Sequence, residues 1–164
     1  MEDRLADPPE PPETEPRVRL RPLQWVGIPL LIMPVLLAAF GVFGESWDTA
    51  NTSSTAVSVA VRWPTRFRYK QLNEVRVWVE NRTPGVLDSV TIALDTAYAS
   101  RFSTVTAIPD FDDAYSLSLV AVRPGERRLA IIELQAERYG RHEGWLDVVA
   151  GDTARLRLHS FVFP

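Results

Sequence analysis

An uncharged apolar run from Leu23 to Phe43 constrains this chain more than any other feature of its sequence. The run holds 21 residues, twelve of them Leu, Ile, Val or Phe, and its one clearly polar side chain, Gln24, stands near its start. A helix rises about 1.5 Å per residue, so roughly 20 apolar residues cross the ~30 Å hydrocarbon core of a bilayer. A buried core helix usually has a polar face, and this run has none. The sequence therefore predicts a transmembrane helix over residues 23–43.

Two prolines, Pro29 and Pro34, lie inside the predicted span. A proline lacks an N–H and clashes with the carbonyl four residues back, so the central Pro34 predicts a kink. Two glycines allow a second helix to approach closely, and a tryptophan near each end suits the membrane interface. A plain anchor that tolerates its prolines is the alternative. The predicted anchor and helix-packing residues are Trp25, Gly27, Pro29, Pro34, Gly41 and Trp47.

Flanking charges give the span a direction. Three arginines lie between residues 17 and 21, whereas no Lys or Arg follows the span until Arg62. The positive-inside rule then predicts a cytoplasmic N-terminus and a C-terminal domain outside. A cleaved signal peptide is the rival interpretation, but its apolar region is only about 7 to 15 residues long. We therefore expect an uncleaved anchor in the inner (cytoplasmic) membrane of a bacterium, with a periplasmic domain.

The residues on either side of the span are polar. Residues 1–22 form a leader whose first 16 positions hold six acids and five prolines. This composition buries too little apolar surface to offset chain entropy, which predicts a disordered cytoplasmic tail. A polyproline-like strand that docks on a partner is the alternative role for the leader. Residues 44–54, GESWDTANTSS, are expected to be a linker.

From residue 55 onward, apolar and polar residues alternate in short runs, as they do in half-buried strands. Residues 57–63 (VSVAVRW) and 75–79 (VRVWV) show this period of two most clearly. Turn signals separate the runs, for example at 81–85 (NRTPG) and at 123–126 (RPGE), where Pro and Gly suit a type II turn. Seven to eight antiparallel strands are expected, which favours an all-β sandwich of immunoglobulin-like type over residues 55–164. A small barrel is the alternative fold.

Two segments of this region follow a recognisable order of strands and turns. Residues 73–95, NEVRVWVENRTPGVLDSVTIALD, place a strand and an asparagine before a glycine-containing turn, and residues 122–150 add a PGE turn and a Gly144-Trp145 pair. The pattern resembles the immunoglobulin-like domains of the bacterial cell-adhesion-related and NPCBM-associated families. The resemblance covers roughly residues 55–163 and implies a sandwich with a role in display or protein contact. It implies no site residues, and the domain is single here rather than repeated.

Few sequence patterns in this chain indicate a catalytic, metal-binding or cofactor-binding site. The chain has no cysteine, so disulfides, thiol nucleophiles and c-type haem attachment are excluded. His142 and His159 match no zinc-binding pattern, and Asp110, Asp112 and Asp113 lack the spacing of a calcium loop. Neither a GxSxG elbow nor a glycine-rich phosphate loop occurs, and the net charge of −3 does not favour nucleic acid. We expect no catalysis, cofactor, metal, nucleic acid or small-molecule substrate.

A basic and aromatic stretch begins in the first of these predicted strands. Arginine mixed with aromatic residues is enriched at protein interfaces, and near a membrane cations suit anionic headgroups. The alternative is a solvated strand edge on which Lys and Arg block pairing with other chains. The candidate partner or lipid contacts are Arg62, Trp63, Arg66, Phe67, Arg68, Tyr69 and Lys70.

Together these features predict a non-catalytic, single-pass accessory or scaffold subunit of a larger membrane complex, with a respiratory or photosynthetic assembly as one host. Its helix would pack against other subunits and lipid, and its outer domain would dock on the same complex. A free-standing cell-envelope adhesion or ligand-binding module is the alternative. An enzyme is the third hypothesis, and no motif favours it.

Overall fold

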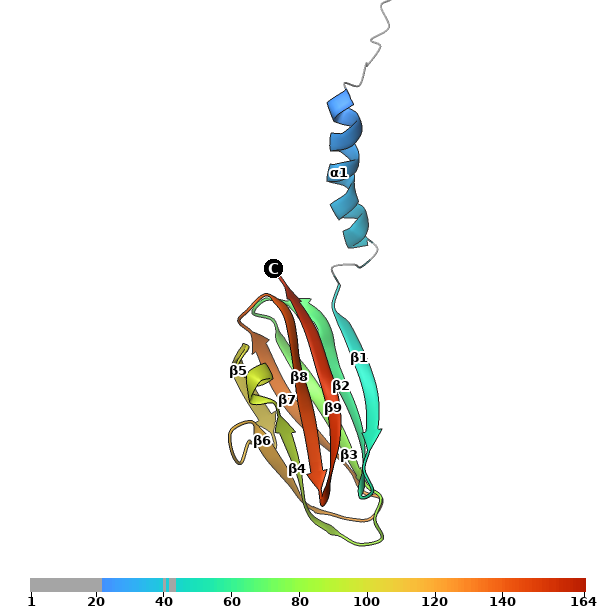
Figure 1. Ribbon diagram of the computed structural model, residues 1–164, viewed down its shortest axis with the longest axis vertical. Helices are drawn as coiled ribbons and strands as arrows, with labels where there is room; N and C mark the ends of the chain where they lie inside the picture. The colour runs from blue at the N-terminus through green and yellow to red at the C-terminus, as the bar shows by residue number, and fades with distance from the viewer. Residues whose placement is uncertain (1–21, 40, 42–43) are drawn as a thin grey trace, which may run out of the picture. The chain divides into compact units, whose positions relative to one another are not determined.

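The computed structural model describes residues 22–39, 41 and 44–164. The chain separates into two compact units, residues 1–43 and residues 44–164. In the first unit, helix α1 runs over Pro22–Ala39 and contains both Pro29 and Pro34 (Figure 1). Pro22, the last residue of the predicted tail, begins this helix, and the other residues of the predicted tail lie outside the described part of the chain.

The predicted membrane span coincides with α1 over most of its length. Residues 40, 42 and 43 at the end of the span lie outside the described residues. None of the helices in the described part of the chain is both long enough and apolar enough to cross a membrane.

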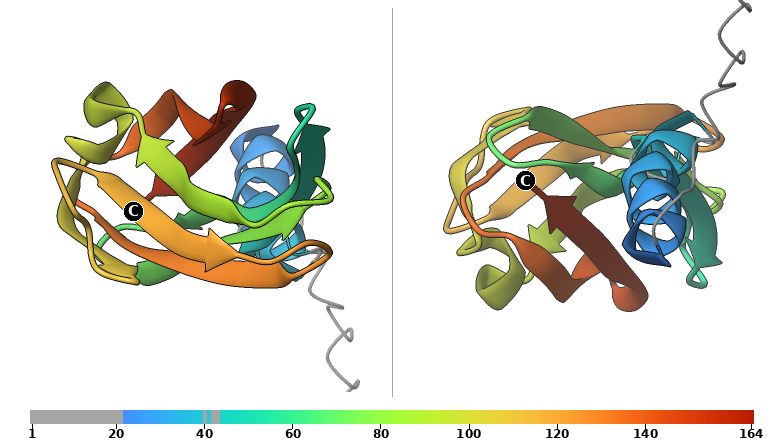
Figure 2. Two further views of the ribbon diagram at one scale, coloured as in Figure 1. Left: turned by 90° about the horizontal axis from the view of Figure 1, so that it is seen from below. Right: turned by 90° about the horizontal axis from the view of Figure 1, so that it is seen from above.

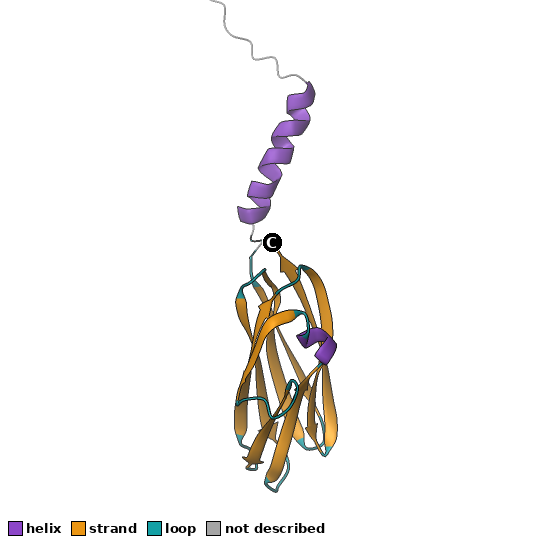
Figure 3. Ribbon diagram, turned by 90° about the vertical axis from the view of Figure 1, so that its left-hand side faces the viewer, coloured by secondary structure: helices purple, strands orange, loops and turns teal. Residues whose placement is uncertain are grey.

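Residues 44–164 form an all-β domain, which confirms the predicted class of fold. Figure 3 shows that strands make up nearly all of this unit and that one short helix interrupts them. Nine strands form where seven or eight were expected. The elements are β1 (Ser46–Ser53), β2 (Val57–Arg68), β3 (Leu72–Asn81), β4 (Leu87–Leu94), α2 (Thr96–Ala99), β5 (Phe102–Ile108), β6 (Ser116–Val122), β7 (Arg127–Ala136), β8 (Gly140–Ala150) and β9 (Asp152–Phe163).

The strands form one sheet in the order β5-β7-β3-β2-β9-β8-β4-β6, and β1 pairs with β2 outside this path. The sheet curls on itself, so that its two halves lie on opposite sides of the domain interior (Figure 2). Residues 66–68 at the end of β2 pair in parallel with residues 161–163 at the end of β9. The prediction of wholly antiparallel strands is therefore wrong for this one pair. The parallel contact joins the two halves of the sheet.

Strand β1 corrects the prediction of a linker over residues 44–54. It pairs with β2 in antiparallel register from Ser46 opposite Arg66 to Ser53 opposite Ser58. Apart from Trp47 and Ala50, the side chains of β1 are polar, and most of the strand is exposed, so its sequence lacks the apolar alternation by which the other strands were predicted. Pairing with a neighbouring strand, rather than burial of its own side chains, orders this segment.

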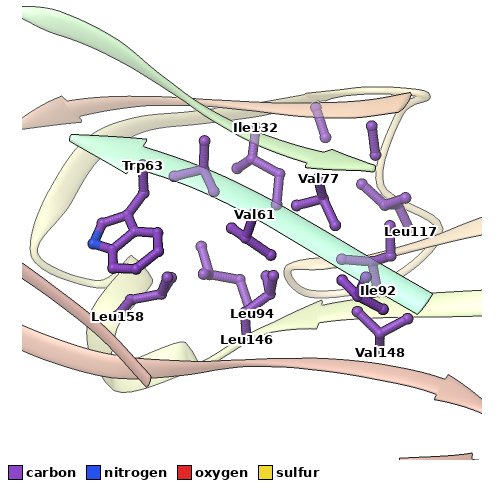
Figure 4. Packing of buried hydrophobic residues seen from close by; sticks show 14 of the residues in the cluster. Val61, Trp63, Val77, Ile92, Leu94, Leu117, Ile132, Leu146, Val148 and Leu158 are labelled. Carbon is purple, nitrogen blue, oxygen red and sulfur yellow. The ribbon is translucent and has the colours of Figure 1, made fainter. Parts of the chain in front are cut away.

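The core lies between the two halves of the sheet (Figure 4). Val61 of β2 and Val77 of β3 are fully buried on one side, and Ile92 of β4 and Leu146 of β8 are fully buried on the other. Successive side chains of a strand point to opposite faces, so every second residue from Val57 to Trp63 enters this core, and the alternation is broken at Pro64 and Thr65. The period of two in the sequence thus correctly identified the inward-facing valines.

Asp152, at the start of β9, fastens the β8–β9 turn to the loop between β1 and β2. Its Oδ2 accepts hydrogen bonds from the backbone N–H of Thr55 at 2.9 Å and from the Thr55 hydroxyl at 2.7 Å. Such bonds favour the charged carboxylate. With the backbone N–H of Thr55 as the main cause, they lower the pKa of Asp152 from 3.8 to about 2.

We expect Asp152→Asn to lower the free energy of unfolding at pH 7. The folded-state pKa lies below the unfolded one, so the stabilising effect of the carboxylate is complete above about pH 4 and is lost as the pH falls toward 2. Urea unfolding of the variant and the natural chain at the two ends of this range measures the difference, which should shrink in acid. Asp88→Asn is the control, because Asp88 is exposed. An Asp152→Asn effect of equal size at both pH values would contradict the assignment.

Candidate functional site

Strand β2 carries most of the predicted contact residues, and its pleat separates them into two sets. Trp63 and Phe67 are buried in the core, at 2% and 0% exposure. Arg62, Arg66 and Arg68 lie on the outer face and are exposed. The two buried aromatics belong to the core rather than to a contact surface, which corrects that part of the prediction. The alternation of basic and aromatic residues along one strand was itself the sign that they face opposite sides.

Tyr69 and Lys70 follow β2 and remain at the surface. Tyr69 is half-buried and packs on Tyr139, with ring centroids 4.5 Å apart. The ammonium of Lys70 lies 5.6 Å from the centroid of the Tyr69 ring, within the range of a cation–π contact. The structure thus brings these two predicted residues together with Tyr139, which comes from the loop between β7 and β8.

A groove of about 480 Å³ opens beside these residues, where β1, β2, β8 and β9 meet. Trp47 and Phe161 are exposed at its rim. The guanidinium of Arg62 lies 5.1 Å from the centroid of the Trp47 ring. The residues that line the groove are Ser46, Trp47, Asp48, Thr65, Arg66, Arg141, His159, Ser160 and Phe161. A concave surface with aromatic rims and two guanidinium groups suits anionic or amphipathic partners.

Sequence reasoning identified only Trp47 and Arg66 among the residues of this groove. Arg141, His159 and Phe161 come from β8 and β9, more than 70 residues further along the chain. The β2–β9 and β8–β9 pairings bring them together, with Arg66 and Arg141 both opposite Phe161. No local pattern in the sequence indicates these long-range registers.

The floor of the groove is polar, but its hydrogen bonds are satisfied. The hydroxyl of Ser160 donates to the backbone oxygen of Pro64 at 2.7 Å and lies 3.0 Å from the hydroxyl of Tyr98. Burial raises the pKa of Tyr98 to about 12. Ser160 therefore donates to a carbonyl rather than to a base that could activate it.

The histidine and glutamate side chains that could act in catalysis instead make contacts that stabilise the fold. His142 is buried against the ring of Phe102, and its Nε2 lies 2.8 Å from the backbone oxygen of Arg138. Glu143 pairs with Arg157 and Arg141, and the hydrogen bond from Arg157 is the main cause of its lowered pKa. Within residues 22–39, 41 and 44–164, no group of three or more His, Asp or Glu side chains is arranged to hold a metal ion.

The predicted anchor residues divide between the two units. Gly27, Pro29 and Pro34 lie within α1, and Gly41 follows it with a φ of 71°. A Cβ built at Gly27 meets no atom within 4 Å, so no contact inside the described chain requires a glycine there. Trp47 instead lies in β1, at the groove, and the structure does not describe the side chain of Trp25.

Comparison with protein families and with curated proteins assigns no function to this chain. No protein-family model matches the chain, and no curated protein matches it. Among solved structures, a β-glucosidase from Listeria innocua in complex with isofagomine is similar over 73% of this chain, at 12% sequence identity and a TM-score of 0.37. The match spans 16% of the glucosidase chain. A likeness at this level says nothing about activity.

Proposed function

We propose that this protein is a non-catalytic accessory or scaffold subunit, anchored in a membrane by the apolar run of residues 23–43, of which α1 is the described part, and docked on other subunits through its all-β domain. The observation that carries the proposal is the surface of α1. Eight of its large apolar side chains are exposed: Val26, Ile28, Leu30, Leu31, Ile32, Met33, Val35 and Leu36. At about 100° per residue they point to every side of the helix. Exposure of that much apolar surface to water is unfavourable, so lipid or partner helices are its natural surroundings.

The strand order supports an immunoglobulin-like sandwich as the finer description of the outer domain. Strands β2, β3, β7 and β5 are neighbours in the order of the A, B, E and D strands of that fold, and β9, β8 and β4 follow the order G, F and C. Strand β6 then takes the place beside C. Domains of this kind mostly present loops and strand faces to partners, in line with the resemblance of residues 73–95 and 122–150 to adhesion-related domains.

The contacts of the polar residues favour binding over catalysis. Ser160 donates to a backbone carbonyl, His142 is buried beside Phe102, and Glu143 is held between two arginines. What the domain offers at its surface is a groove with aromatic rims and exposed arginines, a combination enriched at protein interfaces.

Extraction of native membranes in a mild detergent tests the proposal. We expect the tagged chain to migrate in a complex larger than its own 18.5 kDa and to co-purify with other membrane subunits. Pro34→Ala should leave the chain in the membrane fraction but reduce the recovered partners severalfold, because a straighter helix presents a different packing surface. Pro84→Ala, in an exposed loop of the domain, is the matched control. A monomer without companions would contradict the subunit role and favour a free-standing envelope module.

A further inference from the structure

Cationic side chains gather at one end of the all-β domain, the end at which β1 begins. The strand registers bring together the start of β1, the ends of β2 and β9 and the start of β8. The start of β5 joins the end of β7 nearby, and the backbone N–H of Lys70 donates to the oxygen of Ala136 at the end of β7. Figure 1 shows these strand ends at the same end of the domain. We call this surface the basic end. Its cations are Arg66, Arg68, Lys70, Arg101, Arg138 and Arg141.

The basic end differs in charge from the opposite end of the domain. Residues 44–48, 65–73, 98–103, 135–143 and 159–164 hold these six cations and the four acids Glu45, Asp48, Glu137 and Glu143, which gives a net charge of +2. The opposite end comprises residues 54–57, 80–88, 122–128 and 149–154. It holds four arginines and four acids, a net charge of zero. The excess of positive charge therefore belongs to one end only.

The cations of the basic end are also less neutralised by ion pairs than those along the sides of the domain. On the sides, Arg76 pairs with Glu74 and Arg155 pairs with Asp147. In the part of the chain that the structure describes, five ion pairs form, and they leave out four cations of the basic end: Arg68, Lys70, Arg101 and Arg138. Their charge is therefore available to an external anion.

Exposed aromatic rings accompany these cations. Trp47 and Phe161 lie at the rim of the groove, at 37% and 49% exposure, and Tyr139 is 56% exposed in the β7–β8 loop. Aromatic side chains with an apolar body and a polar tip settle at the headgroup level of a bilayer, where cations meet lipid phosphates. This combination of exposed cations and aromatic rings suits the headgroup level of a bilayer better than it suits an end of the domain that faces only water.

We propose that the basic end is a docking surface for an anionic lipid bilayer, with lipid phosphate groups as the ligands of its arginines. The inference rests on the proposed anchoring by α1. Ala39 ends α1 and Ser46 begins β1, and the seven Cα–Cα steps between them span at most about 25 Å, so an anchored helix keeps the start of β1 near the bilayer. Each Lys or Arg near an anionic surface shifts the ratio of docked to undocked domains about fivefold. The helix thus supplies the attachment, and the basic end sets the orientation of the domain.

Reconstitution of the full chain into vesicles tests the inference. The chain has no natural cysteine, so Ser100→Cys beside Arg101 and Val86→Cys at the opposite end each give one site for a fluorescent probe. A quencher carried in the lipid headgroups reports contact with the bilayer. In vesicles that contain phosphatidylglycerol we expect strong quenching at residue 100 and little at residue 86. In pure phosphatidylcholine, quenching at residue 100 should fall, and added salt should weaken it in the anionic vesicles.

A charge variant provides the matched comparison. Changing Arg68, Arg101 and Arg138 together to Gln should reduce the docked-to-undocked ratio about 100-fold, whereas changing Arg82, Arg123 and Arg127 to Gln should leave it unchanged. Flotation with neutral vesicles measures anchoring separately, so failure to float overturns the proposed function itself. Flotation with equal quenching on neutral and anionic vesicles overturns the docking surface alone. Protection of residue 100 in native membranes but not in pure lipid would likewise overturn it, in favour of an acidic protein surface.

Discussion

Replacement of Gly144 by alanine is expected to lower the free energy of unfolding of the all-β domain by about 3 kcal/mol, at the upper end of the cost of overpacking. A Cβ built at Gly144 lies 2.3 Å from the Cβ of Tyr98 and 2.9 Å from its Cγ. Gly144 is paired with Leu158 inside the β8–β9 ladder, and Tyr98 is fully buried in α2. The backbones of β8 and α2 cannot move apart without disturbing the core. The added methyl group therefore lowers the free energy of unfolding.

Urea unfolding followed by tryptophan fluorescence measures this effect. Gly85→Ala is the control, because a Cβ at Gly85 meets no atom within 4 Å. We expect the control to stay within about 0.5 kcal/mol of the natural chain, as surface substitutions usually do. If Gly144→Ala proved as stable as the control, this result would contradict the close packing of α2 on β8.

Replacement of Asn81 by alanine is the second substitution with a large expected effect, about 3 kcal/mol. Asn81 ends β3 and is 1% exposed. Its Nδ2 donates to the backbone oxygens of Gly85 at 2.8 Å and Val122 at 2.9 Å. Its Oδ1 accepts from the backbone N–H and the hydroxyl of Thr83, both at 2.8 Å. Alanine would remove the partner of the Val122 oxygen and of the Thr83 N–H, whereas the Thr83 hydroxyl and the Gly85 oxygen keep their own hydrogen bond at 2.9 Å. Each unsatisfied buried group costs about 1–3 kcal/mol.

Asn73 provides a control on the same strand. It is also buried, at 4% exposure, but its side chain makes one hydrogen bond, from Nδ2 to the backbone oxygen of Gln71. Asn73→Ala should therefore cost about 1 kcal/mol, roughly a third of the cost at Asn81. The difference between the free energies of unfolding of the two variants, measured with urea, gives the contribution of the additional hydrogen bonds of Asn81. Equal losses would show that Asn81 does not tie its turn to the end of β6.

Asn81 also connects two turn motifs of the sequence by hydrogen bonds. The NRTPG turn begins at Asn81, and the RPGE turn follows Val122. The backbone N–H of Gly125 donates to the oxygen of Asn81 at 2.9 Å, and that of Asn81 donates to the oxygen of Glu126 at 3.2 Å. Gly125 has a φ of 71°, as the third position of the predicted type II turn requires. The turns could be predicted locally, but their contact depends on the pairing of distant strands.

The all-β class followed from the sequence because burial on one face imposes a period of two, as at Val57, Val59 and Val61. Strand β1 could not be predicted in this way, since its exposed polar residues gain order only by pairing with β2. Trp63 and Phe67 share a basic stretch with Arg62, Arg66 and Arg68, and their mixed composition predicts a single contact surface. The pleat of β2 separates the two kinds of residue.

The candidate site was less accessible to sequence reasoning than the fold. Arg66 and Arg68 were identified, but Arg101 and Arg138 stand alone in their segments of sequence and form no motif. Only the pairing of β7 with β5 and the hydrogen bond from Lys70 to Ala136 place their segments beside the end of β2. A surface assembled from the ends of several strands leaves no local pattern.

Anchoring by α1, with the all-β domain outside, is tested most directly by labelling single cysteines in intact bacterial cells. The natural chain has no cysteine, so Ala114→Cys in an exposed loop of the domain and Ala6→Cys in the leader can be compared without background. With a membrane-impermeant maleimide, we expect residue 114 to react in intact cells and residue 6 to react only after lysis. Reaction of both residues only after lysis, or recovery of the chain in the fraction that does not sediment with membranes, would contradict the proposed anchor and its direction.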